Sequence, residues 1–346
     1  MAAMEKPGDR GGTGLADAFG RRITYLRLSV TDRCDFRCRY CMAEKMQFLP
    51  KREILTIEEL AALADAFIAR GIRKIRLTGG EPLGRRGIDE LVRLIGRRIG
   101  AKDDGVGLDE LTVTTNASQL RRHAPALAEA GVRRVNVSLD SLDAERFGFI
   151  TRGGDLAVVL DGIAAARAAG IAVKVNMVAL RDLNEQEIEP MLRWCAAEGH
   201  DLTLIETMPL GEIEDDRTDR YLPLDGVRRR IEEHYTLSPL DYRTGGPARY
   251  FRVEELDARL GLITPLTNNF CDGCNRVRVT ATGQIYMCLG HEDRLDLRQA
   301  LRAGDMEGLD RLLDRAMRLK PERHAFRIDT PGAAPAVSRH MSVTGG

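Results

Sequence analysis

The sequence has no excess of charge of either sign, because its 52 Lys and Arg residues balance its 52 Asp and Glu residues. A chain with this balance offers no general attraction to nucleic acid or anionic lipid, so any anion site must be built locally. The sequence also lacks an apolar run long enough to span a membrane, and residues 1–14 lack the apolar core of a secretory signal. We therefore expect a cytoplasmic protein in a reducing compartment, with neither nucleic acid nor membrane as a partner.

Cysteine is scarce, with seven residues in 346, yet Cys34, Cys38 and Cys41 stand close together with the spacing C-x3-C-x2-C. In a reducing compartment such a group indicates metal binding rather than disulfides. A [4Fe-4S] cluster normally takes four Cys thiolates. Three local ligands would leave one iron open to bind and activate a small molecule. A structural zinc knuckle or a chance grouping is the alternative.

A second group of thiols, Cys271, Cys274 and Cys288, has the spacing C-x2-C-x13-C. Taken alone, it could also supply three of the four ligands of a zinc site, with His291 as a possible fourth ligand. Because the first triad is present, we favour a second iron–sulfur cluster, again with one open iron that would hold a substrate nitrogen or oxygen. The remaining Cys195 stands alone in a helical stretch, where a buried structural role is the ordinary one.

Short β-branched runs alternate with longer helical stretches over most of the chain. Thr56, Ser118 and Asn184 stand where N-cap residues are expected at the starts of three of these helices. Helical crossovers force neighbouring strands to be parallel, but a closed barrel has eight such units. The pattern predicts an α/β protein with an incomplete (β/α)6 TIM-type barrel, and an open doubly wound sheet is the alternative. The expected strands are residues 23–30, 72–78, 111–115, 132–139, 171–178 and 202–207.

This rhythm changes after about Tyr235, where Pro and Gly residues interrupt the chain. Short strand-like pieces and two helical stretches surround the second thiol group, and the sequence ends in Gly345-Gly346. We expect three parts: a flexible leader (1–20), the partial barrel (21–235) and an appended C-terminal iron–sulfur cluster module with a Gly-Gly tail (236–346).

Polar sets follow several predicted strands at the point where each strand ends. In parallel α/β folds ligands bind at this edge of the sheet. One of these sets, Gly79-Gly80-Glu81-Pro82, contains two glycines that would let a backbone approach a ligand closely. An ordinary turn is the alternative for that segment alone. The other sets are Thr114–Asn116, Asn136–Asp140 and Glu206–Met208.

Basic residues stand inside predicted strands, where apolar neighbours surround them. Arg27, Arg76 and Lys174 each lie in mid-strand, so by alternation each can point into the barrel, and Arg276 and Arg278 closely follow Cys274. Buried cations need anionic partners. Arg is suited to bidentate contacts with phosphate, so the set favours a phosphate-bearing substrate.

These motifs together resemble the radical S-adenosylmethionine (SAM) superfamily and, more closely, the GTP 3',8-cyclase family of molybdenum cofactor biosynthesis. The first triad carries the superfamily resemblance. The second triad, the segment Asn275–Arg278 and the terminal Gly-Gly carry the cyclase resemblance, which extends from about Arg21 to the end of the chain. It implies two [4Fe-4S] clusters, the first binding SAM through its open iron and the second binding the guanine of GTP.

The resemblance also implies roles for single residues. The tail Gly345-Gly346 would reach into the active site. The chain departs from the family at Thr203, where many relatives carry Arg, and at Ala117, where Gly is frequent. The implied SAM contacts are Tyr40 (through its backbone), Gly80, Ser138 and Met208, and the implied GTP contacts are Arg27, Arg76, Thr114, Lys174, Arg276 and Arg278.

The activity of the family would make this chain a lyase. Reductive cleavage of SAM would yield a 5'-deoxyadenosyl radical that takes hydrogen from C3' of GTP, and C3' would then bond to C8 to give (8S)-3',8-cyclo-7,8-dihydro-GTP. This is the first step of molybdopterin biosynthesis, upstream of cyclic pyranopterin monophosphate synthase. We expect a monomer or homodimer and an electron donor of unknown identity. The alternatives are a radical SAM peptide-modifying enzyme with an auxiliary cluster and a non-enzymatic iron–sulfur or zinc-binding protein.

Overall fold

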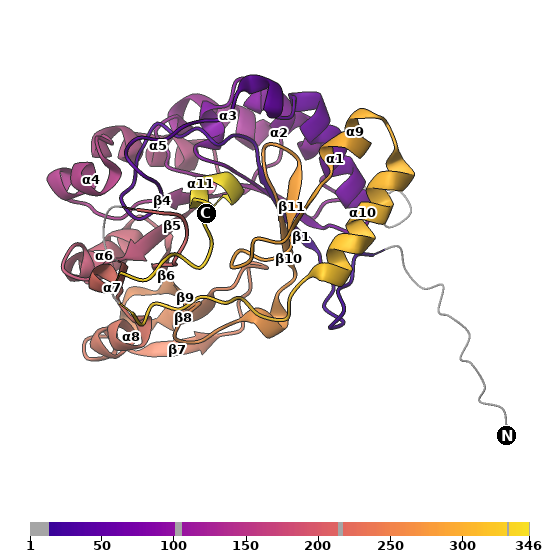
Figure 1. Cartoon of the computed structure of the whole chain (residues 1–346). Coiled ribbons are helices and arrows are strands. Elements are labelled where there is room, and N and C mark those ends of the chain that lie inside the picture. Colours follow the sequence, from indigo (N-terminus) through magenta and orange to yellow (C-terminus); the bar gives the residue numbers. More distant parts are fainter. Residues whose placement is uncertain (1–13, 101–105, 214–216, 331, 346) are drawn as a thin grey trace.

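A curved sheet with helices outside it forms the body of the molecule (Figure 1). The computed structural model describes residues 14–100, 106–213, 217–330 and 332–345. The first six strands pair in chain order and are all parallel, which confirms the incomplete barrel and its six strands. They are β1 (Tyr25–Ser29), β2 (Lys74–Thr78), β3 (Glu110–Thr115), β4 (Arg134–Ser138), β5 (Ala172–Ala179) and β6 (Asp201–Glu206).

Helix α1 (Ile57–Ala69) shows how the sequence specifies a strand–helix unit. The Thr56 side chain accepts a hydrogen bond from the Glu59 amide, while the Glu59 carboxylate accepts one from the Thr56 amide, so both ends of a capping box are present. After the helix, Gly71 takes a φ of +88°, which glycine adopts without steric cost. The helices that follow are α2 (Ile88–Gly96), α3 (Leu120–Glu129), α4 (Ala144–Thr151), α5 (Leu156–Ala168), α6 (Ile188–Ala197), α7 (Arg217–Arg220) and α8 (Leu224–Glu232).

Two predicted N-caps do not cap through their side chains, although Asn184 does hold the N-cap position of the 3-10 turn that leads into α6. Ser118 lies before the start of α3, and its hydroxyl donates to Asp35 Oδ2 at 2.5 Å instead of capping the helix. Asn184 precedes a short 3-10 turn, and its side chain accepts from the Leu180 amide and donates to the Asp140 carbonyl. Both side chains are taken by long-range contacts near the ends of the strands, which sequence patterns do not reveal.

The C-terminal part of the chain extends the same sheet at both edges. Strand β9 pairs with β6 in parallel, and β10 pairs with β1 in parallel. The result is one 12-stranded sheet in the order β12-β11-β10-β1-β2-β3-β4-β5-β6-β9-β8-β7. The expected boundary near residue 236 stays a prediction. The strands are β7 (Leu237–Leu240), β8 (Arg249–Val253), β9 (Ala258–Ile263), β10 (Arg276–Val279), β11 (Gln284–Tyr286) and β12 (Arg294–Asp296), and the helices are α9 (Arg298–Arg302), α10 (Met306–Leu319) and α11 (Met341–Thr344).

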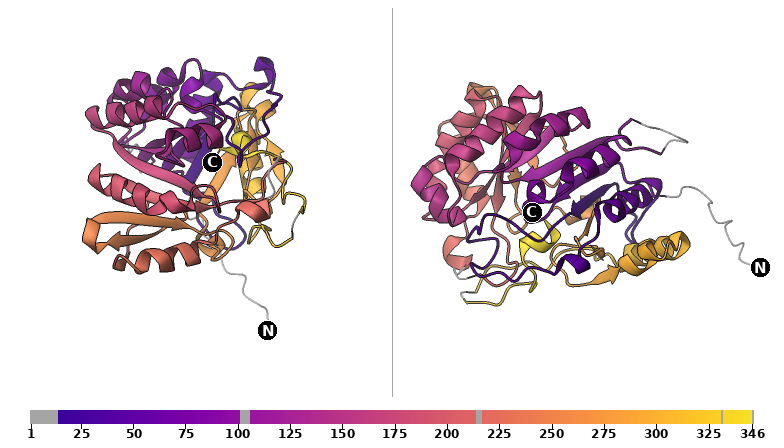
Figure 2. Two further views of the ribbon diagram at one scale, coloured as in Figure 1. Left: turned by 90° about the vertical axis from the view of Figure 1, so that its left-hand side faces the viewer. Right: turned by 90° about the horizontal axis from the view of Figure 1, so that it is seen from above.

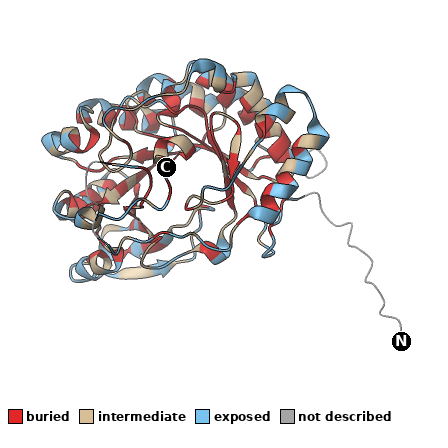
Figure 3. Cartoon of the chain, in the orientation of Figure 1, coloured by how far each residue is buried: buried red, intermediate tan, exposed pale blue. Residues whose placement is uncertain are grey.

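The main core lies between the sheet and its outer helices, where the strands are almost wholly buried (Figure 3). The sheet is not closed, because its outermost strands β12 and β7 do not pair with each other. The short helix α11 lies within the curve of the sheet in all views (Figures 1 and 2). Among the described residues, every helix is too short or too polar to span a bilayer.

Candidate active site

The first thiol loop is fastened to the carboxyl ends of β1 and β2. The amides of Gly80 and Glu81 donate to the carbonyls of Thr31 and Arg33 at 2.9 and 2.8 Å. A Cβ on Gly80 would lie 2.1 Å from the Arg33 carbonyl oxygen. The Gly-Gly segment therefore lets a backbone approach closely, as predicted, but the approaching group is the thiol loop itself.

The three cysteines of this loop are half-buried. Burial raises the pKa of Cys38 well above its ordinary value, and the neighbouring Cys41 and Asp140 raise it further. Burial likewise raises the pKa of Cys41 to about 12 and raises that of Cys34, with Glu81 adding to the effect. Three thiolates at this site need a positively charged partner, so the donor set fits an iron–sulfur cluster.

The second thiol triad lies in the wall of an internal cavity. Burial raises the pKa of Cys274, but Arg276 and Lys320 lower it more, to about 7. Lys320 Nζ lies 3.6 Å from Cys274 Sγ and donates to the carbonyls of Arg276 and Met287. Sequence reasoning missed Lys320, because it follows α10, far along the chain from the thiols, with no local signal.

A row of arginines lines the same cavity. Arg27 pairs in register with Arg76 on one side and Arg278 on the other, so the three side chains share the inner face of the sheet. Arg276 also lines the cavity. Burial and the neighbouring arginines lower the pKa of Arg27 and bring that of Arg278 to about 10.

These guanidinium groups are buried without enough acceptors. Within the described residues, nitrogen atoms of Arg27, Arg76 and Arg278 are buried with no hydrogen-bond partner. Unpaired buried charge is unfavourable. A ligand that carries several negative charges would supply the missing acceptors, and its binding here stays a prediction.

Two of the expected substrate contacts lie outside the cavity wall. Lys174, only 4% exposed, contacts the hydroxyl of Tyr250. Thr114, on β3, has a buried hydroxyl with no partner among the described residues, and so does Thr203 on β6. Sequence reasoning did not single out Tyr250.

The residues expected to contact SAM lie on several different segments of the chain. Met208 lines the cavity, Gly80 touches the loop, and Ser138 ends β4. The hydroxyl of Tyr40 donates to Asp140 Oδ2 at 2.7 Å. All four lie at the carboxyl-terminal side of the strands, and their contacts with SAM stay a prediction.

The end of the chain connects the two thiol loops. Arg339 donates to the carbonyls of Cys288, Leu289 and His291, while the backbone of Ser342 forms a hydrogen bond with the Cys41 sulfur. A Cβ on Gly345 would lie 2.0 Å from Thr78 Oγ1 at the end of β2. Met341, which is next to Ser342, lines the cavity that holds the second triad. Cys34 lines a different hollow together with Glu81, so a space shared by the two triads stays a prediction. Gly346 lies outside the described residues.

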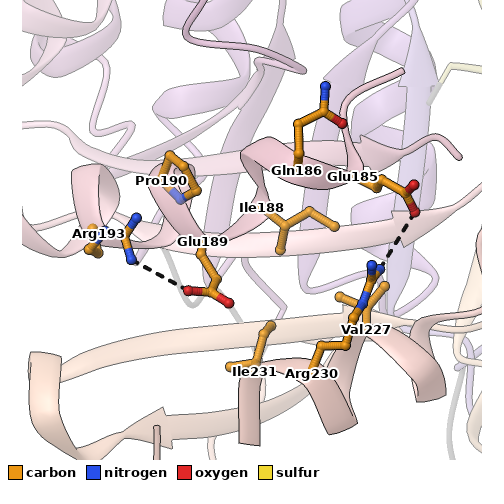
Figure 4. A pocket seen from close by; sticks show the side chains of 9 residues that line it. All are labelled: Glu185, Gln186, Ile188, Glu189, Pro190, Arg193, Val227, Arg230 and Ile231. Carbon is orange, nitrogen blue, oxygen red and sulfur yellow. Dashed lines mark hydrogen bonds and ion pairs between the residues drawn. The ribbon is translucent and has the colours of Figure 1, made fainter. Parts of the chain in front are cut away.

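A separate groove lies on the outside of the barrel between α6 and α8 (Figure 4). Its sides carry ion pairs, including Arg230 to Glu185 at 3.6 Å and Arg193 to Glu189 at 3.4 Å. It is lined by no thiol of either triad.

In the described part of the chain, no three His, Cys, Asp or Glu side chains converge to hold a single metal ion. The side chain of His291 forms a hydrogen bond with the Arg323 carbonyl.

Comparison with known proteins agrees with this geometry. The family description "Radical SAM superfamily" matches residues 28–195, and "Molybdenum Cofactor Synthesis C" matches residues 200–326. Proteins named GTP 3',8-cyclase include one from Rhizobium etli (strain CIAT 652), 60% identical over 96% of this chain and 94% of its own. Another, from Erythrobacter litoralis, is 60% identical over 96% of this chain and 98% of its own.

The solved structures add a likeness of fold. The crystal structure of Streptococcus suis SuiB bound to S-adenosylmethionine matches with a TM-score of 0.59 over 87% of this chain and 67% of that chain. The sequence identity is 14%, so this likeness concerns the fold alone. Together with the near full-length sequence matches, it gives one conclusion: the chain belongs to the GTP 3',8-cyclase family of the radical SAM superfamily.

Proposed function

We propose that this chain converts GTP to (8S)-3',8-cyclo-7,8-dihydro-GTP, the first step of molybdenum cofactor biosynthesis. The observation that carries the proposal is the row of buried, incompletely paired arginines that shares one cavity with the second thiol triad. A nucleoside triphosphate matches this wall, because its phosphates supply the missing acceptors and its base offers ligand atoms to a metal.

Each thiol triad has its own role. Cys34, Cys38 and Cys41 would hold the [4Fe-4S] cluster that binds SAM, and the second triad would hold a [4Fe-4S] cluster beside the guanine. When bound, the first cluster and SAM supply the radical chemistry that removes hydrogen from C3'. The protein contributes binding, orientation and exclusion of water.

The cavity wall divides this work between its residues. The arginines on β1, β2 and β10 would hold the triphosphate, which leaves the sugar and base a restricted set of positions. Apolar side chains of Met208, Phe326 and Met341 lie in the same wall and keep water from a reactive carbon.

The free cysteines suit a reducing compartment such as the cytoplasm, and the product would pass to cyclic pyranopterin monophosphate synthase.

Two substitutions test this function in anaerobic assays of the reconstituted protein. Cys34→Ala should abolish formation of 5'-deoxyadenosine, because the first cluster loses a ligand. Arg278→Ala should reduce cyclisation about 100-fold or more, since a buried charge contact to phosphate is lost, while cleavage of SAM without product formation is less affected.

The control is Cys195→Ala, which changes a buried thiol outside both triads and should retain both activities. Undiminished cleavage in Cys34→Ala would contradict the role of the first triad. Equal loss of cleavage and cyclisation in Arg278→Ala would contradict a role for Arg278 on the substrate side.

A further inference from the structure

Tyr250, on β8, connects a buried cation to the wall of the cavity. It is 3% exposed, its hydroxyl contacts Lys174 Nζ, and the same oxygen lies 3.3 Å from Thr244 Oγ1. The Lys174 ammonium also lies 5.0 Å from the centre of the Tyr250 ring. Since Gly246 and Pro247 form part of the cavity wall, Tyr250 joins Lys174 to the loop that closes this part of the cavity.

Cations outnumber carboxylates around this tyrosine. Burial lowers the pKa of Lys174 well below its ordinary value, and Arg76 and Arg134 lower it further. Glu110 is already bound to Lys74 at 2.5 Å and to Arg134 at 2.6 Å. Asp201, which raises the pKa of Lys174, is bound to Arg259 at 2.7 Å. Among the residues with described positions, no carboxylate forms an ion pair with Lys174 or Arg76, and a further negative charge from a ligand would be stabilised between them.

The neighbouring strands leave room for the tyrosine ring. Gly261 pairs in register with Thr203. A Cβ on Gly261 would lie 2.9 Å from Tyr250 Cε1 and 3.0 Å from Thr203 Oγ1. Glycine and a short threonine at these two positions are therefore what allows the ring of Tyr250 to reach across to Lys174.

The order of the strands gives this cation its place relative to the substrate. The second triad adjoins β10, which carries Arg278, and Arg27 and Arg76 follow on β1 and β2. With the base beside the second triad, the phosphates extend along this row. Lys174 lies on β5, which β3 and β4 separate from β2 in the sheet. It still interacts electrostatically with Arg76, so phosphates that pass Arg76 can extend towards Lys174.

We propose that Tyr250 is a positioning residue, which fixes Lys174 where the terminal phosphate of the nucleotide binds and so favours a triphosphate over a diphosphate. This inference rests on the proposed cyclisation of GTP. A lysine side chain is long and flexible, so a hydroxyl that holds its ammonium group reduces the conformational entropy lost when phosphate binds.

Calorimetric titration of the anaerobically reconstituted protein with GTP and with GDP tests the proposal. The unchanged protein should bind GTP more tightly than GDP. Tyr250→Phe keeps the ring and removes the hydroxyl, so GTP binding should weaken about ten-fold, the size expected for one hydrogen bond to a charged group, while GDP binding stays within about two-fold.

Tyr242→Phe is the matched control. It removes the same atom from the ring that packs edge-on against Tyr250 at 4.9 Å between centroids, and it should bind both nucleotides as the unchanged protein does. Equal GTP binding by Tyr250→Phe and the unchanged protein would overturn the inference, and so would an equal loss for GTP and GDP. Failure of the unchanged protein to bind GTP would instead overturn the proposed function.

Discussion

At the scale of single residues, the surroundings of a sulfur atom affect how readily it becomes a thiolate. Cys195 is 1% exposed within the core, and burial raises the pKa of its thiol. Cys274 is also mostly buried, yet Arg276 and Lys320 bring its pKa to about 7. Because the thiolate is the metal ligand, the nearby cations favour Cys274 for this role. The other five triad cysteines have raised pKa values, as Cys195 has, and differ from it in their grouping along the sequence.

Substitution of each cysteine by alanine should separate these roles. Cys195→Ala should keep the full iron and sulfide content and lose about 1 kcal/mol of unfolding free energy, because it removes one buried atom from the core. Cys274→Ala should lose about half of the iron, because one of the two clusters lacks a ligand. Iron and sulfide analysis after anaerobic reconstitution measures both. Equal iron loss in the two variants would contradict the assignment.

Glu81 gives stability a dependence on pH. It is 2% exposed, and burial raises its pKa from 4.5 to about 7, although hydrogen bonds from Asn116, Leu83 and Thr115 oppose the shift. The folded protein therefore binds this proton more tightly than the unfolded chain. The stabilisation is fully present below the unfolded pKa and is lost as the pH rises towards 7.

The expected loss between pH 4.5 and 7 is up to roughly 3 kcal/mol of unfolding free energy. Glu81→Gln removes the titration, so its unfolding free energy should change less across this range, although its absolute stability is lower because an amide nitrogen faces backbone donors. Urea unfolding of both proteins at pH 5 and pH 8 measures the difference. The same pH dependence in both would contradict the prediction.

At the scale of secondary structure, the regular units could be predicted and their local adaptations could not. In strands β1 to β6 apolar residues alternate with polar ones, which is a strong signal for a strand. Helix α4 was not predicted, because it has only eight residues and a Gly inside it. Its role is tertiary: the carbonyls of Ile150 and Thr151 accept from the amides of Arg39 and Arg37 in the first thiol loop.

The candidate site was predictable where it follows strand periodicity. Alternation within strands placed Arg27 and Arg76 inside the barrel correctly, and the spacing of the cysteines found both triads. Lys320 and Tyr250 reach the site from segments that the sequence gives no reason to associate with it. Long-range contacts of this kind depend on the pairing of β9 and β10 with the barrel, which local patterns do not specify.

Two glycines of one turn should respond differently to alanine. A Cβ on Gly80 would lie 2.1 Å from the Arg33 carbonyl oxygen and 2.8 Å from the Cys34 nitrogen, whereas a Cβ on Gly84 would have nothing within 4 Å. Gly80→Ala should cost roughly 3 kcal/mol or more and displace the first thiol loop, with loss of the first cluster. Gly84→Ala should retain iron. Thermal unfolding and iron analysis of both variants decide the matter, and full iron in Gly80→Ala would contradict it.

At the scale of the whole molecule, the C-terminal third completes the sheet that the first two thirds begin. Strand β1 pairs with β10 and β6 pairs with β9, so both edges of the six-stranded part are covered by residues beyond 235. Uncovered strands with buried side chains promote aggregation. The sheet of the predicted partial barrel (21–235) therefore depends on the predicted C-terminal module (236–346) to cover its edges.

Truncation after residue 235 should leave a chain that does not fold stably. It would expose both edges of the sheet together with apolar side chains packed under β9 and β10. Circular dichroism during heating should show no cooperative transition, whereas the full chain should show one. A cooperative transition with resistance to proteolysis in residues 1–235 would show instead that the partial barrel is an independent folding unit.

The pairing of β1 with β10 has a consequence for biosynthesis. The ribosome synthesises the first thiol loop early. Strand β10, which pairs with β1, and the segment around Arg339 and Ser342 are synthesised only near the end of translation. Chains fold from the N-terminus as they are made when early segments are self-sufficient; here they are not. We therefore expect the cavity to be complete only after translation ends and iron to be inserted into the finished chain.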